Sequence, residues 1–525
     1  MTRRVLVIGL DGATWNLLDP WIEEGELPNL RKLILNGVSG DLESSIPSTT
    51  FPAWKCYSTG KKPEKFGIYS FVGVDLKNKK IVIHDSTSCK SEELWDHMGK
   101  KGLRVGVVNM PTTFPPKKVN GFMVCGPFST KGYTFPKKLE RELEENYGYK
   151  IISNYHLTRD KDIGSVIRTM KSRFDFVKDA LRKENLDFLH LTIFSTDTVQ
   201  HFLWDSKEVK CVWKHVDEYL GDLLDSLNEK FTCIIMSDHG FTRLKARFCL
   251  DTWLEKKGYL KMKPNLVFRG MLTALDSLGL SSDILYSILR KLKVFRMLSK
   301  VLPTGMRIKL ARYVSRIGMR KLKGMESKID WNHSNVIPCL SLLYLNPDRP
   351  ESRKIKKKLP KELSKVKNPK NGEQIIKRVY SKEEIYSETN LPMAPDLVLV
   401  PKEGYHISNL VGKNVIVDSW EGGWVGTHEQ KGIFIAYGSN IKEDAKIEGA
   451  KIVDLAPTIL HMMRLPVPKD MDGKVLKEIF KEGSDPARRA VKYEDYEETI
   501  GERDTRFISR KEEIKERLRK LGYLG

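Results

Sequence analysis

Short apolar runs of strand length recur along the chain, and they constrain its fold more than any other feature. The six clearest runs are Val5–Ile8, Val105–Val108, Phe188–Ile193, Cys233–Met236, Leu397–Val400 and Ile433–Tyr437. Several of them are continuous rather than alternating, which is typical of strands buried on both faces of a sheet. Helical patterns separate several of the runs, at Leu27–Leu35, Ile163–Arg182 and Val212–Leu227. The sequence therefore predicts an α/β fold with a mostly parallel central sheet and helices on both faces.

Length and composition exclude several classes of protein. A chain of 525 residues with 40% hydrophobic residues can bury a large core. No run approaches the roughly 18 apolar residues that a bilayer span needs. The apolar stretch near the N-terminus is too short for a signal peptide and has no small-residue cleavage site, so we expect a first core strand there. Seven dispersed cysteines without a CxxC pair are typical of reduced thiols, and we expect a cytoplasmic protein.

The excess of basic residues, +22 in total, is concentrated in one segment. Between Lys256 and Met325 there are 17 lysines and arginines against 2 aspartates. Apolar residues recur there at three- and four-residue steps, which predicts amphipathic helices. We predict a catalytic core formed by residues 1–250 and 329–480, a basic helical insertion at 251–328, and a charged helical tail at 481–525.

Three roles are open for the basic insertion. Its apolar helix faces can pack together as a lid over an active site. Residues 264–323 can also lie on an anionic membrane surface, since basic amphipathic helices bind at lipid interfaces. Nucleic acid is the least favoured partner, because few aromatic residues interleave with the lysines. The sequence specifies no oligomeric state.

Residues of metal-ligand type stand at or just beyond the ends of several apolar runs. They are Asp11 in VIGLDG, Asp197 and His201 in STDTVQH, Asp238 and His239 in SDHGF, and His428 in GTHE. Each motif alone has an ordinary explanation, as a turn, a helix N-cap or a surface loop. In an open α/β sheet, however, ligands bind at the carboxyl ends of the strands. We therefore predict that these side chains converge on a metal centre.

The number and spacing of these residues indicate two metal ions. Asp197 and His201 are separated by four positions, which makes them neighbours on one helical face. Six ligands divide into two sets of three, leaving open positions for substrate oxygens. Two ions about 4 Å apart can clamp the attacking and departing oxygens of a phosphate ester.

The motif PSTTFPAW supplies three candidate nucleophiles, Ser48, Thr49 and Thr50. Coordination to a metal would lower the pKa of the Thr50 hydroxyl and make it a competent nucleophile. The alternative is a cluster of helix N-cap residues. Both interpretations can hold together, since the N-terminus of a helix also favours a phosphate anion.

The ordered motifs LDG, TFP with the following STGKKPEKFGI, DxxxH, SDHG and GxH resemble the alkaline phosphatase superfamily. The closest similarity is to its type I phosphodiesterase/nucleotide pyrophosphatase branch, over about Val5–Phe248 and Asn332–Phe480. The resemblance implies an alkaline phosphatase-like fold. It also implies a covalent phosphothreonine, formed by the threonine before Phe-Pro, which is Thr50.

The resemblance also implies which residues hold which ion. The first ion falls to Asp197, His201 and His428. The second falls to Asp11, Asp238 and His239, with the nucleophile hydroxyl beside it. The ions in that family are usually zinc, and manganese or iron occurs in relatives.

Two departures from the family pattern concern the substrate. The family typically reads TFPNH, where this chain has Ala53 and Trp54, and TGxxPxxHGI, where it has Phe66 in place of His. Asn109, after another predicted strand, is our candidate for the substrate-binding donor that the Asn of TFPNH supplies. A phosphomonoesterase or phosphotransferase of the same superfamily remains the alternative to a phosphodiesterase. A sulfatase is excluded by the lack of a CxPxR-like motif.

Overall fold

The computed structural model describes residues 4–129, 131–152, 163–204, 206–227, 231–263, 329–386, 393–409, 414–418 and 424–495. Most of the predicted basic insertion (251–328) and of the charged tail (481–525) lies outside the described residues. The lid, membrane-surface and nucleic-acid roles of residues 264–323 therefore stay predictions. Within the part of the chain that is described, no helix is both long and apolar enough to cross a membrane.

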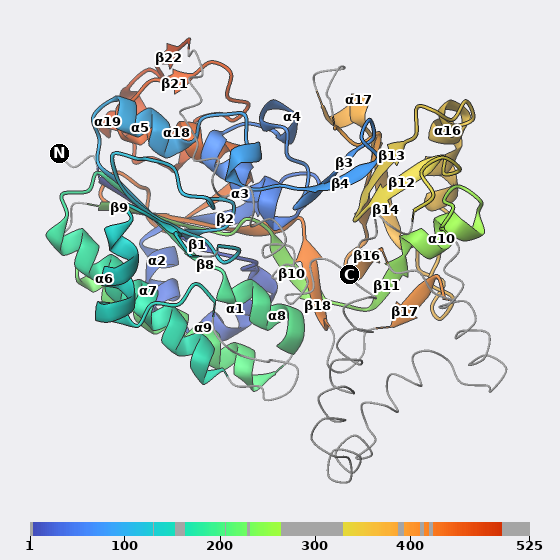
Figure 1. Cartoon of the computed structure of the whole chain (residues 1–525). Helices are drawn as coiled ribbons and strands as arrows, with labels where there is room; N and C mark the ends of the chain where they lie inside the picture. Colours follow the sequence, from blue (N-terminus) through green and yellow to red (C-terminus); the bar gives the residue numbers. More distant parts are fainter. Residues whose placement is uncertain are drawn as a thin grey trace, which may run out of the picture.

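A large sheet forms the centre of the molecule (Figure 1). It has nine strands in the order β20-β2-β19-β9-β1-β8-β5-β6-β7. Its strands are β1 (Arg4–Leu10), β2 (Gly37–Glu43), β5 (Val105–Met110), β6 (Gly121–Cys125), β7 (Thr134–Phe135), β8 (Phe188–Ile193), β9 (Phe231–Met236), β19 (Lys431–Tyr437) and β20 (Ala445–Lys451). The strands from β9 to β6 are parallel, whereas β19 is antiparallel to both of its neighbours. The predicted α/β fold with a mostly parallel central sheet is confirmed.

Helices cover both faces of this sheet (Figure 1). One face carries α1 (Trp15–Glu23), α2 (Pro28–Leu35), α6 (Lys138–Tyr147), α7 (Gly164–Lys183), α8 (Ser195–Leu203) and α9 (Lys207–Asp225). The other carries α3 (Thr50–Thr59), α5 (Leu94–Lys100) and α18 (Leu455–Met462). In α7, Val166, Met170, Phe174 and Val177 are buried at three- and four-residue steps. This apolar stripe is the periodic signal that predicted the helix.

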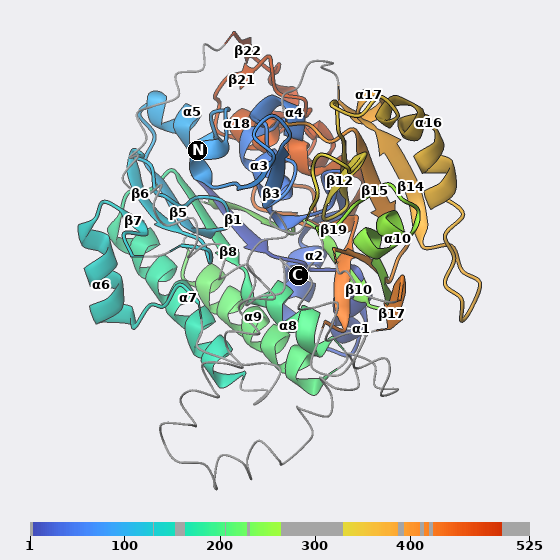
Figure 2. The same ribbon diagram turned by 45° about the vertical axis from the view of Figure 1, so that its right-hand side comes forward.

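A smaller antiparallel sheet lies beside the central one (Figure 2). It contains β12 (Val336–Cys339), β13 (Leu342–Leu345), β15 (Leu397–Pro401) and β14 (Ile376–Ser381), in that order, and lies near α10 (Leu250–Lys256) and α16 (Ser352–Leu363). The apolar run Leu397–Val400 is a strand of this sheet, not of the central one. An apolar run indicates burial, but it does not specify which strands pair.

Three adjacent strands of the central sheet bring the aspartates to one edge. β9 and β8 pair in parallel with the two sides of β1. Asp238, Asp11 and Asp197 follow the ends of β9, β1 and β8 respectively. Because the strands are parallel neighbours, all three carboxylates meet at the carboxyl edge of the sheet.

His428 reaches this edge from a distant part of the chain. The strand β10 (Gly240–Arg243) begins directly after His239 and pairs antiparallel with β18 (Gly426–Glu429). In this pair Phe241 lies opposite His428. The two-stranded ladder thus brings the last predicted ligand beside the first five.

Candidate metal centre

Asp197, His201 and His428 form a first set, whose ligand atoms all lie within 4.8 Å of one another. The helix α8 places Asp197 and His201 one turn apart, with 3.4 Å between Oδ1 and Nε2. The Nε2 atom of His428 lies 3.1 Å from Asp197 Oδ1 and 3.0 Å from His201 Nε2. One carboxylate and two imidazoles converging in this way are typical zinc ligands.

Asp11, Asp238 and His239 form a second set, with ligand atoms likewise within 4.8 Å of one another. His239 Nε2 lies 3.3 Å from Asp238 Oδ2 and 3.7 Å from Asp11 Oδ1. All three side chains are fully buried. Among the described residues, neither Asp11 Oδ1 nor Asp238 Oδ2 has a hydrogen-bond partner. Buried carboxylate oxygens without donors are costly unless a cation compensates them, so this set fits a metal ion.

The two sets adjoin, and the segment from Ser48 to Thr50 contacts both of them. The rings of His239 and His428 stack with their centroids 3.7 Å apart. Thr50 Oγ1 lies 3.3 Å from His239 Nε2, while the backbone carbonyl of Ser48 lies 3.3 Å from His428 Nδ1. Thr50 is the first residue of α3 and is fully buried. The Thr50 hydroxyl is therefore held beside the second set, at the histidine that stacks on His428 of the first.

Backbone hydrogen bonds select the tautomers of the imidazoles. His201 Nδ1 lies 3.0 Å from the carbonyl oxygen of Gly426, and His239 Nδ1 lies 3.1 Å from that of Gly240. A carbonyl oxygen only accepts hydrogen bonds, so Nδ1 carries the proton and the neutral Nε2 presents a lone pair. These lone pairs face carboxylate oxygens and, in the first set, a second Nε2 atom. A cation between them would satisfy all of these groups, so the residues fit a metal ion in each set.

The protonation tendencies of the carboxylates differ between the sets. Burial raises the pKa of Asp11 well above its usual range, and the charges of Asp238 and Asp197 raise it further. Burial and the charge of Asp197 also raise the pKa of Asp238. Burial opposes ionisation of Asp197 as well, but His201 and His428 outweigh it and hold its pKa well below the usual range. The second set therefore depends more strongly on a cation to remain ionised.

A family model described as type I phosphodiesterase / nucleotide pyrophosphatase matches residues 5–429. The chain belongs to this family. It is accordingly a phosphoric ester hydrolase, and the match spans Thr50 and every member of both sets. No curated protein matches the chain.

Solved structures share the fold at low sequence identity. Murine ectonucleotide pyrophosphatase/phosphodiesterase 5, solved as an inactive variant in complex with AMP, is 16% identical with a TM-score of 0.52, and the match covers 91% of this chain and 100% of that chain. The human protein of the same name is also 16% identical, with a TM-score of 0.53, and the match covers 91% of this chain and 99% of that one. Phosphonoacetate hydrolase from Sinorhizobium meliloti 1021 in complex with phosphonoacetate is 15% identical, with a TM-score of 0.54 and coverage of 88% and 96%. These similarities show that the fold is alkaline phosphatase-like.

The structure separates the three hydroxyls that the sequence offers as nucleophiles. Thr50 Oγ1 contacts a ligand residue, as described above. Thr49 occupies the N-cap position of α3 but makes no side-chain cap, and among the described residues its Oγ1 has no hydrogen-bond partner. Ser48 contacts the first set through its carbonyl oxygen. The helix N-terminus predicted as the ordinary alternative is therefore present, and Thr50 lies at its first position.

Asn109, the predicted substrate residue, lies within β5 and has a left-handed backbone with φ of 59°. Its Nδ2 donates a hydrogen bond of 2.8 Å to the carbonyl oxygen of Thr192 on β8. Within the described residues its Oδ1 has no partner, and no described contact joins Asn109 to Thr50 or to either set. The observed contact ties two strands together, and the substrate role of Asn109 stays a prediction.

Two tryptophans that the sequence analysis did not assign to the site contact its ligands. Trp54 Nε1 donates a hydrogen bond of 2.9 Å to Asp11 Oδ2. Trp424 stacks on His201 with 3.6 Å between ring centroids. The available signal for Trp54 was its spacing, because a residue four positions after Thr50 lies on the same face of the helix.

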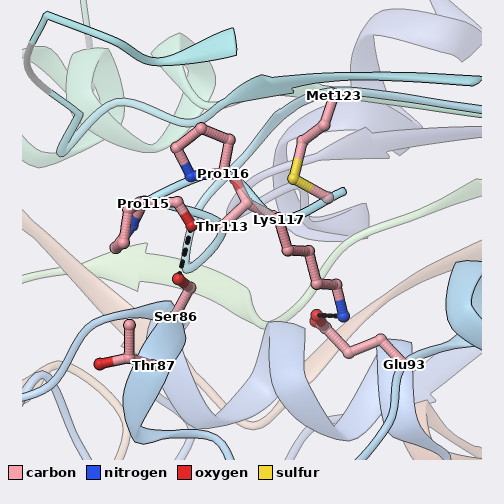
Figure 3. A pocket seen from close by; sticks show the side chains of 8 residues that line it. All are labelled: Ser86, Thr87, Glu93, Thr113, Pro115, Pro116, Lys117 and Met123. Atoms are coloured by element: carbon pink, nitrogen blue, oxygen red, sulfur yellow. Dashed lines mark hydrogen bonds and ion pairs between the residues drawn. The ribbon is translucent and has the colours of Figure 1, made fainter. Parts of the chain in front are cut away.

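A small hollow elsewhere in the structure contains none of the candidate ligands (Figure 3). Its lining residues are Ser86, Thr87, Glu93, Thr113, Pro115, Pro116, Lys117 and Met123. Glu93 pairs with Lys117 at 2.8 Å and with Lys55 of α3 at 2.7 Å. Burial opposes ionisation of Glu93, but these two lysines lower its pKa to about 2. Glu93 therefore neutralises the charge of Lys117, so the hollow does not fit a phosphate anion. The buried ion pair between Glu93 and Lys55 anchors α3.

Proposed function

We propose that this protein is a two-metal phosphodiesterase that acts through a covalent phosphothreonine at Thr50. The observation that carries the proposal is the position of Thr50 Oγ1, 3.3 Å from His239 Nε2 where the two sets adjoin. The similar murine protein was solved with AMP as an inactive variant. We therefore infer a nucleotide-type phosphodiester as the substrate class.

The proposed reaction has two steps, each a displacement at phosphorus. First, Thr50 Oγ attacks phosphorus, the Oγ–P bond forms and the bond to the leaving oxygen breaks. The hydroxyl proton of Thr50 passes to solvent, and the departing oxygen takes a proton from water. Then water attacks phosphorus, the Oγ–P bond breaks, Thr50 Oγ takes back a proton, and a phosphate monoester that keeps the second ester group leaves.

The surrounding residues favour this chemistry in two ways. The two sets would hold metal ions, which would supply positive charge that lowers the pKa of a hydroxyl and stabilises phosphoryl oxygens. We propose zinc in both, with manganese or iron as the alternative. The helix α3 begins at Thr50, and the positive end of the helix dipole favours a bound phosphate there.

The test compares cleavage of bis-p-nitrophenyl phosphate and p-nitrophenyl phosphate by metal-stripped, zinc-loaded and manganese-loaded protein. The informative variant is Thr50→Val, which keeps the shape of the side chain and removes the hydroxyl. Thr49→Val is the matched control, since it removes a neighbouring buried hydroxyl. We expect metal-dependent diester cleavage that Thr50→Val abolishes and Thr49→Val retains. Intact-mass spectrometry of wild-type protein quenched during diester cleavage should also detect one added p-nitrophenylphosphoryl group, and Thr50→Val should lack it.

Two results would change the assignment. A preference for the monoester would favour a phosphomonoesterase or phosphotransferase of the same superfamily, for which the departures at Ala53, Trp54 and Phe66 leave room. Full activity of Thr50→Val would contradict the phosphothreonine and leave water as the direct nucleophile.

A further inference from the structure

Trp54 stands at a position where the chain departs from its family's usual motif, and its side chain contacts the second set. The indole is fully buried, and its Nε1 atom lies 2.9 Å from Asp11 Oδ2. An indole N–H only donates hydrogen bonds, so Trp54 cannot itself bind a cation. Its contact with Asp11 therefore acts on the carboxylate and not on the ion.

The hydrogen bond distinguishes the two oxygens of Asp11. Oδ2 accepts the indole N–H, whereas Oδ1 points to His239 Nε2 at 3.7 Å and has no hydrogen-bond partner among the described residues. With Oδ2 occupied, Oδ1 is the oxygen left for a metal ion. We propose that Trp54 is a positioning residue that makes Asp11 a one-oxygen ligand and so sets the metal affinity of the second set.

The surroundings of the indole hold it in this orientation. A Cβ atom at Gly9 would lie 2.3 Å from Trp54 Cη2, so the strand β1 leaves room for the ring only because it has glycine there. On the neighbouring strand β8, His190 meets the ring edge-on with 5.7 Å between centroids. His190 is itself fixed between Tyr57 Oη at 3.0 Å and Thr192 Oγ1 at 2.7 Å. A ring that packs closely against both β1 and β8 keeps its N–H directed at Asp11.

The same helix carries the nucleophile. Thr50 and Trp54 are one turn apart on α3, and they contact His239 and Asp11 respectively. Both contacts go to the second set, so α3 fixes the hydroxyl and the ligand oxygen relative to one another. A partner of this kind typically changes metal affinity by about 10- to 100-fold when it is removed.

The test measures zinc binding to one set at a time, which separates this inference from the proposed function on which it rests. The Asp197→Asn background leaves only the second set to be measured, and the Asp238→Asn background leaves only the first. In these backgrounds Trp54→Phe keeps a buried ring and removes the N–H. We expect about 10- to 100-fold weaker zinc binding by the second set and unchanged binding by the first.

Trp95→Phe is the matched control. Trp95 is also fully buried, and among the described residues its indole N–H has no hydrogen-bond partner. The Trp95→Phe protein should bind zinc as tightly as its parent in both backgrounds. If Trp54→Phe does not fold, Gly9→Ala replaces it, because the added Cβ must displace the indole and should weaken the second set selectively.

The outcomes are distinct. Superimposable zinc isotherms for Trp54→Phe and its parent, or an equal loss in both sets, would overturn the role of Trp54 while leaving the two-metal function intact. Failure of the unsubstituted protein to bind two ions per chain would overturn the proposed function and this inference with it.

Discussion

The first and second sets use similar residues but differ in what they need from a metal ion. In the first, two imidazoles and one carboxylate lie within hydrogen-bonding distance of each other, and His428 is 14% exposed. In the second, two carboxylates share one imidazole, and all three side chains are fully buried. The first set is thus partly satisfied by its own members, whereas the second holds two carboxylates together away from the protein surface.

This difference indicates that the two sets play unequal parts in stability. Like charges in a buried site repel each other strongly, because the low dielectric of the interior does not screen them. The second set is therefore the one that strains the metal-free protein, and it is also the one beside Thr50. We expect Asp11, Asp238 and His239 both to destabilise the metal-free protein and to take part in catalysis.

The largest expected effect is on activity, and it should be similar for the two sets. Asp238→Asn and Asp197→Asn should each lower diester cleavage by about 1,000-fold or more, since the charge stabilisation from one ion is worth several kcal/mol. Rate measurements with saturating zinc test this. Asp454→Asn, a buried aspartate that accepts N–H bonds from Lys451 and Lys474, is the control. Loss of diester cleavage in only one of the two variants would contradict the proposal that both ions take part in catalysis.

Metal removal should cost the protein stability in a pH-dependent way. At a free zinc concentration 1,000 times the dissociation constant, each ion should add about 4 kcal/mol to the free energy of unfolding. The raised pKa values of Asp11 and Asp238 mean that their contribution to metal-free stability is greatest below their usual pKa and is lost as pH rises through the raised values.

Burial instead lowers the pKa values of His201 and His239. Their contribution is present above their usual pKa and is lost as pH falls below it. The stabilisation by zinc should therefore be larger at about pH 7.5 than at about pH 5.5, where protons compete for the ligands. Calorimetry with and without chelator measures this difference. Equal stabilisation at both pH values would contradict the assignment of these side chains as ligands.

In the metal-free protein the two sets should respond to neutralisation with opposite signs. Asp238→Asn removes a buried charge beside Asp11 and should raise the free energy of unfolding by about 1–3 kcal/mol. Asp197→Asn removes a carboxylate that two imidazoles stabilise, and should lower it by a similar amount, about 1–3 kcal/mol. Urea unfolding with chelator at neutral pH compares them. Changes of the same sign would show that the sets do not differ as proposed.

The smallest expected effect concerns the aromatic neighbour of the first set. Trp424 stacks on His201, and a contact of this type is worth about 0.5–1.5 kcal/mol. Trp424→Leu should therefore weaken zinc binding by the first set about 2- to 12-fold and leave the second unchanged. Zinc titration in the Asp238→Asn background isolates the first set, and titration in the Asp197→Asn background isolates the second. A larger loss of zinc affinity in the second set would contradict the assignment of Trp424 to the first set and Trp54 to the second.

The sequence allowed prediction of those features that depend on local patterns. Continuous apolar runs predicted β1, β8 and β9, and the four-residue spacing of Asp197 and His201 placed them on one helical face. Parallel pairing then made it reasonable to expect Asp11, Asp238 and Asp197 at one edge. These inferences need only strand burial, helix periodicity and the polarity of a parallel sheet.

Other features depend on partners that are distant in sequence. Leu397–Val400 belongs to the smaller sheet, although its apolar pattern resembles that of a central strand. The edge strand β20 has mostly exposed residues and is interrupted by Lys446 and Glu448, so it gave no continuous apolar signal. The contact of Trp54 with Asp11 joins a helix to a strand across 43 positions, and no local pattern specifies it.

The pairing of β10 with β18 also fixes when the site can be completed. Everything in the second set, together with Thr50, is encoded before residue 240, but the first set lacks a ligand until His428 has been added. During synthesis from the N-terminus, a growing chain therefore contains the residues for one ion long before those for two. The active site is complete only when the last part of the core has been added. A chain that stops before His428 should therefore be catalytically inactive, even if its second set has already bound zinc.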